Sequence, residues 1–171
     1  TNEQLVDLVV YPSQYRNTSY GRKTDGSNEW VFFTDHSAGK TNNGKKYAAE
    51  QCSKPEFNTP GGFYKNPITI SLASPMTGDT IYYTRDGAEP TRSHTLYTQG
   101  SVIGINNTSI VRARCFSGNK PASDIVSNTY FINERNFKLP VVSIITEQKN
   151  LTDNTIGIYV QGTNGITGNG I

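Results

Sequence analysis

Alternation between apolar and polar residues marks two stretches of the chain as β-strands with one buried face. Residues 68–72 have the sequence Ile-Thr-Ile-Ser-Leu, and residues 110–116 have the sequence Ile-Val-Arg-Ala-Arg-Cys-Phe. Successive side chains of a strand point to opposite faces of the sheet, so a period of two gathers the apolar members on one face. For the second stretch this predicts that Cys115 lies in the core and that two arginines face outward.

Further β-type stretches recur through the middle of the chain, with turn sequences between them. They are rich in β-branched and aromatic residues and lie at residues 81–84, 101–105 and 124–132. The intervening residues are mostly Pro, Gly, Asn and Asp, which favour turns. Strands at intervals of about 12 to 15 residues predict an all-β fold, an immunoglobulin-like antiparallel β-sandwich.

Apolar runs also occur on both sides of this predicted sandwich. They predict strands at residues 5–11, 29–33, 139–145 and 157–160, with turn chemistry at 17–28. We therefore expect four parts, at residues 1–45 (part of a β-domain), 46–59 (a linker), 60–133 (the sandwich) and 134–171 (the first strands of a further region). Since these flanking parts lack strands to complete them, we expect the chain to be a piece of a longer protein.

Composition supports a sheet protein and excludes several classes of function. Val, Ile and Thr number 44, against 14 for Leu, Ala and Met, and β-branched residues fit strands better than helices. With 18% charged residues and a net charge of +2, the chain lacks the basic excess of a nucleic-acid-binding protein. No apolar run approaches the roughly 18 residues that a membrane span needs.

One turn of the predicted sandwich carries a recognisable motif. Residues 81–91 have the sequence Ile-Tyr-Tyr-Thr-Arg-Asp-Gly-Ala-Glu-Pro-Thr. Together with Pro-Gly-Gly-Phe-Tyr at 60–64, Val-Arg-Ala at 111–113 and residues 123–130, this resembles the chitobiase/β-hexosaminidase C-terminal domain family. The resemblance implies a small immunoglobulin-like sandwich without catalytic residues, in which the turn residues are structural. Those turn residues are Tyr83, Thr84, Asp86, Gly87 and Pro90.

Two flanking segments carry further resemblances. Residues 6–42 resemble the last strands of a lamin-tail domain, through Val6-Asp7, Ser-Tyr-Gly-Arg at 19–22 and Trp30. They depart from the usual Thr-Pro-Gly of that family at residues 38–42. Residues 139–162 resemble the opening of CotH-type spore-coat kinase proteins, whose catalytic segments lie further on, so no catalytic residue is carried over. These resemblances imply a bacterial surface protein.

The best pair of carboxylates for glycoside hydrolysis is Asp86 and Glu89. An aspartate in a turn usually accepts a hydrogen bond from the backbone two residues on, so we interpret Asp86 as a structural residue and expect no catalytic site, cofactor or metal. The glycine-rich end at 165–170 lacks the spacing of a phosphate-binding loop. Aromatic side chains that could contact a glycan include Trp30 and Tyr82, although strand aromatics more often serve packing.

The sequence thus predicts a non-catalytic accessory module of a large exported bacterial protein, secreted or at the cell surface. Its expected role is spacing, packing or adhesion, and its expected partners are neighbouring domains of the parent chain, with a glycan or a cell-surface component as a further candidate. Nucleic acid and a membrane span are not expected. Two alternatives stay open: a carbohydrate-binding module of a chitobiase- or hexosaminidase-like glycosidase, and an N-terminal accessory part of a CotH-like kinase.

The two cysteines differ in their predicted surroundings. Cys115 falls on the apolar face of its strand, whereas Cys52 lies in a polar segment before Pro55. A disulfide needs Cα atoms within about 7 Å, so we expect Cys52 and Cys115 not to be bonded to each other. An oxidising compartment would favour the opposite outcome.

Overall fold

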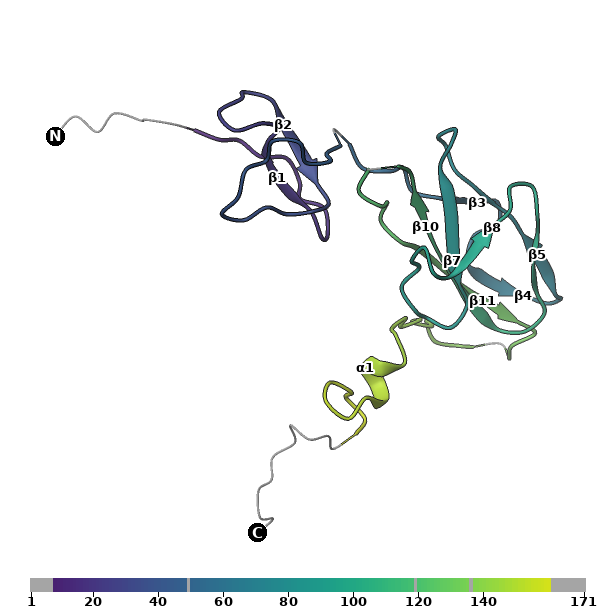
Figure 1. Ribbon diagram of the computed structural model, residues 1–171. Helices are drawn as coiled ribbons and strands as arrows, with labels where there is room; N and C mark the ends of the chain where they lie inside the picture. The colour runs from purple at the N-terminus through teal and green to yellow at the C-terminus, as the bar shows by residue number, and fades with distance from the viewer. Residues whose placement is uncertain (1–7, 49, 119, 136, 161–171) are drawn as a thin grey trace, which may run out of the picture. The chain divides into compact units, whose positions relative to one another are not determined.

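The computed structural model describes residues 8–48, 50–118, 120–135 and 137–160 (Figure 1). The chain divides into two compact units, each described by itself here. One comprises residues 1–52 with 117–122, and the other comprises residues 53–116 with 123–171. Within the described part of the chain, no helix has both the length and the apolar composition that a membrane span requires.

The larger unit is built around a five-stranded sheet with the strand order β4-β11-β10-β7-β8. Its strands are β4 (Gly62–Tyr64), β7 (Thr80–Thr84), β8 (Thr95–Tyr97), β10 (Ser109–Phe116) and β11 (Val126–Ile132). Neighbours are antiparallel except for β4 and β11, which pair in parallel. Two shorter antiparallel ladders join β3 (Glu56–Phe57) to β6 (Leu72–Ala73) and β5 (Ile68–Ile70) to β9 (Ile103–Ile105). This is the predicted immunoglobulin-like sandwich.

The core follows the alternation in the sequence. On β10, every second residue from Val111 to Cys115 is fully buried, and the intervening arginines are half-buried on the other face. Isoleucines of the short ladders complete the apolar interior, with Ile70 and Ile105 both fully buried. Burying each such side chain contributes about 1.5–3 kcal/mol, so an ionisable residue at Val111 would disrupt the sandwich.

The smaller unit contains the hairpin of β1 (Ser19–Arg22) and β2 (Trp30–Phe33). The turn between these strands has Gly26 at φ 77°, as Asp25-Gly26 predicts. Residues Val31 to Phe33 are almost fully buried, and Phe32 exchanges two backbone hydrogen bonds of 2.9 Å with Ala48. The predicted turn at 17–28 is therefore too long, because its first part forms β1.

The predicted linker at 46–59 contains buried residues. Cys52 is 5% exposed, and its backbone N–H donates to the carbonyl of Pro121 over 3.0 Å within the smaller unit. Cys115 is fully buried in the larger unit, as the alternation predicts. Whether the two cysteines bond to each other stays a prediction.

The C-terminal region differs from the prediction. Residues 139–145 and 157–160 form no strand in the described structure, and α1 (Lys149–Thr152) is a single helical turn that the sequence pattern does not predict. Leu139, Val142 and Ile144 are 79%, 81% and 87% exposed. A strand needs a hydrogen-bonding neighbour, and no described strand pairs with this apolar stretch. The predicted strand at 5–11 is also wrong where it can be checked, because residues 8–11 form no strand. The segment 165–170 lies outside the described residues.

Candidate functional site

The signature turn lies in the loop between β7 and β8, where backbone and side chains close it tightly. Asp86 Oδ1 accepts the backbone N–H of Ala88 at 3.0 Å, and the hydroxyl of Thr84 donates to the Ala88 carbonyl at 2.7 Å. Gly87 has φ 84°, a value that residues with a Cβ rarely adopt. The predicted aspartate turn and the positive φ of its glycine are both present.

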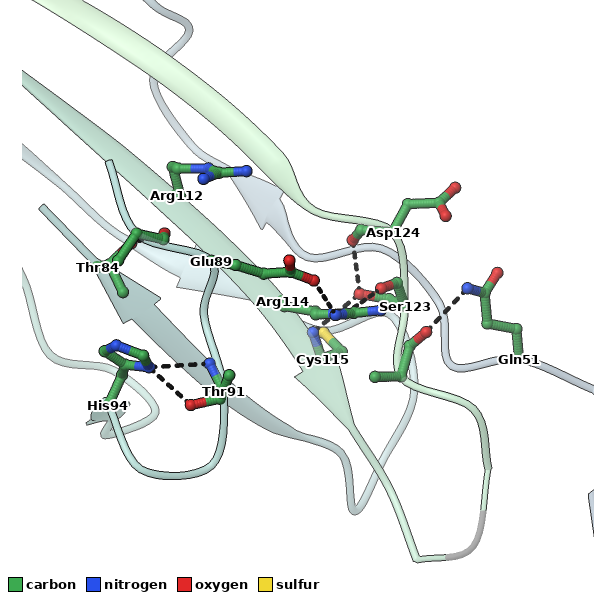
Figure 2. A network of polar contacts seen from close by, with 12 residues as sticks. Gln51, Thr84, Glu89, Thr91, His94, Arg112, Arg114, Cys115, Ser123 and Asp124 are labelled. Atoms are coloured by element: carbon green, nitrogen blue, oxygen red, sulfur yellow. Dashed lines mark hydrogen bonds and ion pairs between the residues drawn. The ribbon is translucent and has the colours of Figure 1, made fainter. Parts of the chain in front are cut away.

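Two arginines on the outward face of β10 hold this turn from the side. Arg112 Nη1 donates to the carbonyl of Gly87 at 2.5 Å. Arg114 Nη1 forms an ion pair with Glu89 Oε1 at 2.9 Å, and the two side chains are only 12% and 22% exposed (Figure 2). Partial burial reduces the competition from water, so this charged hydrogen bond contributes more than an exposed pair would. The sequence placed these arginines outward but did not show what they contact.

Ser123 connects Arg114 to the next strand. It is fully buried, and its backbone carbonyl accepts Arg114 Nε at 2.5 Å. Its hydroxyl accepts the backbone N–H of Cys115 at 2.9 Å and donates to the Asp124 carbonyl at 2.8 Å (Figure 2). Every polar group of the side chain is therefore satisfied, as burial requires.

The network decides how the two carboxylates of the turn are used. Asp86 caps its own turn, and Glu89 pairs with an arginine of the sheet. General acid catalysis needs a carboxyl group free to exchange a proton with the substrate. Asp86 and Glu89 therefore both hold the loop in place, and for Asp86 this is the role that the sequence favoured.

The C-terminal segment runs beside the same turn. A Cβ added at Gly87 would lie 2.6 Å from the backbone oxygen of Thr146. The side-chain hydrogen bond with Lys149 lowers the pKa of the Glu147 carboxyl, and the backbone N–H of Glu89 and the charge of Arg112 lower it further. Gly87 is thus required both for its backbone conformation and for this close approach.

A polar groove opens between the two arms of the β7–β8 loop. Its volume is about 670 Å³, and it is lined by Tyr83, Thr84, Arg85, Asp86, Ser93, His94 and Thr95. His94 Nδ1 accepts the backbone N–H of Thr91 at 3.1 Å and lies 2.8 Å from the Thr91 hydroxyl (Figure 2). The sequence alone does not reveal this contact, because it depends on how the loop folds back.

The two aromatic residues proposed as glycan contacts lie in different units and have packed rings. In the smaller unit, the guanidinium of Arg22 lies 5.0 Å from the Trp30 ring centre, and Tyr20 stacks with Trp30 at 5.6 Å. In the larger unit, Tyr82 meets Phe116 edge to face at 5.5 Å. These contacts favour a packing role for Trp30 and Tyr82, and their use in glycan binding stays a prediction.

Among the described residues, no group of three or more His, Cys, Asp or Glu side chains is arranged to hold a metal ion. His36, which stands next to Asp35 and Ser37 in the sequence, is exposed. Asp35 pairs with Lys45 at 3.6 Å, and Ser37 donates to the side chain of Asn42. These three neighbours therefore do not converge on a common point as a catalytic triad must.

Comparison with known proteins identifies the family of the middle block. The family model described as "Chitobiase/beta-hexosaminidase C-terminal domain" matches residues 59–127, a range that includes the whole signature turn and ends in β11. No curated protein and no solved structure matches the chain. The match confirms the resemblance of the middle block, and it covers neither flank.

Proposed function

Because residues 59–127 form a chitobiase/β-hexosaminidase C-terminal domain, a non-catalytic accessory domain of glycosidases, we propose that this chain is a β-sandwich module that packs against or spaces larger domains. The observation that carries the proposal is the use of both signature carboxylates within the fold. Asp86 accepts a backbone N–H through Oδ1 and Glu89 pairs with Arg114, so both carboxylates help to hold the turn.

The setting that we propose is a large exported bacterial protein, secreted or held at the cell surface. The family's association with glycosidases supports an extracellular location. The resemblance of residues 6–42 to a lamin-tail domain and of residues 139–162 to a CotH-type region supports neighbouring domains on both sides. Exposed apolar residues at 139–144 are consistent with burial against such a neighbour.

Hydrolysis of a chromogenic N-acetylglucosaminide tests the absence of catalysis. The purified chain should release no more chromophore than buffer alone. Asp86→Asn and Glu89→Gln serve as matched variants, because each keeps an oxygen acceptor while removing the charge. Turnover that disappears in either variant would show that the turn is an active site.

Melting of the longer protein tests packing against neighbours. Deleting both compact units (residues 1–171) should lower the melting temperature of the domains that flank them in the longer protein, because the apolar surfaces of those domains would lose cover, and should leave the turnover number of any catalytic domain unchanged. Adjacent domains that melt at the same temperature with and without the module would contradict packing and leave spacing as the role.

A second candidate function is carbohydrate binding by the same module. The observation that favours it is the polar groove of the β7–β8 loop, because its side chains offer both hydrogen-bond donors and acceptors to the hydroxyl groups of a sugar. Neither Trp30 nor Tyr82 lines this groove.

A further inference from the structure

The groove of the β7–β8 loop presents hydrogen-bonding groups of both kinds. Donors come from Arg85, Ser93 and His94, and acceptors come from Asp86 and the hydroxyl groups. Arg85 and Asp86 are exposed, and neither has an ion-pair partner in the described parts of the chain. Its volume of about 670 Å³ lies within the roughly 300–1,000 Å³ of small-molecule sites.

Two of these groups are held in defined orientations. Because a backbone N–H points at His94 Nδ1, that nitrogen carries a lone pair, and the proton of the neutral ring resides on Nε2. The imidazole therefore offers a donor at Nε2. Asp86 Oδ1 is engaged with Ala88, which fixes the plane of the carboxylate and leaves Oδ2 as the acceptor. Groups oriented in advance lose less entropy when a ligand binds.

The balance of charges restricts the ligand. An anion would gain from Arg85 but would meet the carboxylate of Asp86 in the same groove, and a cation would meet the opposite conflict. A peptide side chain would find little apolar surface among these residues. An uncharged polyol satisfies both groups at once, since each hydroxyl donates and accepts.

From this geometry we infer that the groove between residues 83–86 and 93–95 is a low-affinity binding site for uncharged pyranose sugars. The inference rests on the second candidate function and assigns its site. The groove is open and supplies few contacts, so the dissociation constant falls in the millimolar range. Such affinity becomes useful when several modules or ligand repeats act together.

The test is an NMR titration of the whole ¹⁵N-labelled chain with cellobiose, maltose, lactose and N,N′-diacetylchitobiose. At least one of them should give saturable shifts at the amides of Asp86, His94 and Thr95. Inorganic phosphate and glucuronate, added at the same ionic strength, serve as the charged probes and should give smaller shifts there. Arg85→Gln should weaken binding about tenfold or more, through loss of a charged hydrogen-bond donor.

Two further variants separate the groove from the loop that carries it. His94→Asn removes the Nε2–H while an amide oxygen still accepts the Thr91 N–H, so it should weaken binding and preserve the fold. Arg92→Gln removes one positive charge from the same loop, but Arg92 lies over the Phe116 ring at 4.9 Å and does not line the groove. Binding by Arg92→Gln should equal that of the unaltered chain.

Each other outcome overturns a defined part of the inference. Saturable shifts at other residues, unchanged in Arg85→Gln, would show that the module binds sugars elsewhere, so carbohydrate binding would stand and the site would be wrong. No saturable shift with any of the four disaccharides would overturn both. Larger shifts at the groove with phosphate or glucuronate than with the disaccharides would show that the site prefers an anion, so the proposed ligand class would be wrong.

Discussion

Replacement of Gly87 by alanine should destabilise the larger unit by two separable effects. The first is backbone strain, because φ 84° costs a residue with a Cβ about 1–2 kcal/mol. The second is contact, because the new Cβ would lie 2.6 Å from the Thr146 oxygen, a backbone atom that cannot rotate away. Displacing that segment adds about 1–2 kcal/mol, so Gly87→Ala should lose about 2–4 kcal/mol in total.

Gly78 provides the matched control for this measurement. Its φ is 88°, yet an added Cβ would meet no atom within 4 Å. Gly78→Ala therefore carries the backbone strain without the contact, and both variants gain the same small benefit from a less flexible unfolded chain. The difference in unfolding free energy between the two variants therefore measures the cost of the steric contact with Thr146 alone.

The assay must report on the larger unit alone. The only tryptophan, Trp30, belongs to the smaller unit, so fluorescence would follow the wrong part of the chain. Native-state hydrogen exchange at β10 amides measures the opening free energy where the turn is held. If Gly87→Ala and Gly78→Ala agree within about 0.5 kcal/mol, the segment around Thr146 does not press on the turn. If neither loses stability, the strain argument itself is refuted.

Three further predictions concern polar contacts of the same unit. Glu89→Ala should cost about 2–3 kcal/mol and Glu89→Gln about 1–2, because glutamine keeps a hydrogen bond to the arginine partner; equal losses on denaturant unfolding would argue against a role for the charge. Tyr130→Phe should cost about 1–2 kcal/mol, since the buried hydroxyl donates to the Thr59 carbonyl at 2.9 Å. Burial raises the pKa of Tyr130. The stability that its protonated hydroxyl contributes is therefore present below the unfolded-state pKa and lost as pH rises through the folded-state pKa. If the Tyr130→Phe variant and the unaltered chain lose stability equally at alkaline pH, this reasoning is contradicted. The pKa of Glu147 is lowered chiefly by the hydrogen bond with Lys149. The stability that the Glu147 carboxylate contributes is therefore present above its unfolded-state pKa and lost as pH falls through its folded-state pKa. A carboxyl NMR titration of Glu147 with an ordinary midpoint would show that the contact does not form.

Strands with both alternation and length could be predicted from the sequence, and the shortest ones could not. β10 has eight residues with arginines and apolar residues in turn, so its buried face was predicted residue by residue. β8 and β3 have three and two residues, which is too short for any period to be visible. Their strand geometry comes from pairing with β7 and β6, which is tertiary information.

The apolar stretch at 139–145 shows the opposite error. Its β-branched residues favour a strand, but strand formation also needs a neighbour with free backbone groups. The structure leaves Val142 and Ile144 exposed, and the hydroxyl of Ser143 instead contacts that of Thr129 at 2.6 Å. Composition therefore identified a segment able to form a strand and could not show whether a partner is present.

The candidate site was predictable in its turn and not in its supports. Asp-Gly in a β-hairpin implies an aspartate acceptor and a positive φ, and both are present at Asp86 and Gly87. The supporting arginines lie 25 residues away in the sequence, and no local pattern links them to the turn. Contacts of this kind follow from strand register, which a single sequence does not specify when turns are long.

These contacts divide the residues of the β7–β8 loop into two sets, one that holds the turn and one that faces solvent. Each residue of the first set has a structural role. Asp86 accepts a backbone N–H, Gly87 adopts a positive φ and Glu89 forms an ion pair with Arg114. Pro90 belongs to the same set. It is fully buried, and because proline has no backbone N–H, no buried donor is left without a hydrogen-bond partner there. Arg85 and Ser93 are exposed and contribute nothing of this kind to the core. A change at Arg85 or Ser93 can therefore alter what the groove binds while the turn and sandwich stay intact, so the ligand preference of this module should change with those two positions.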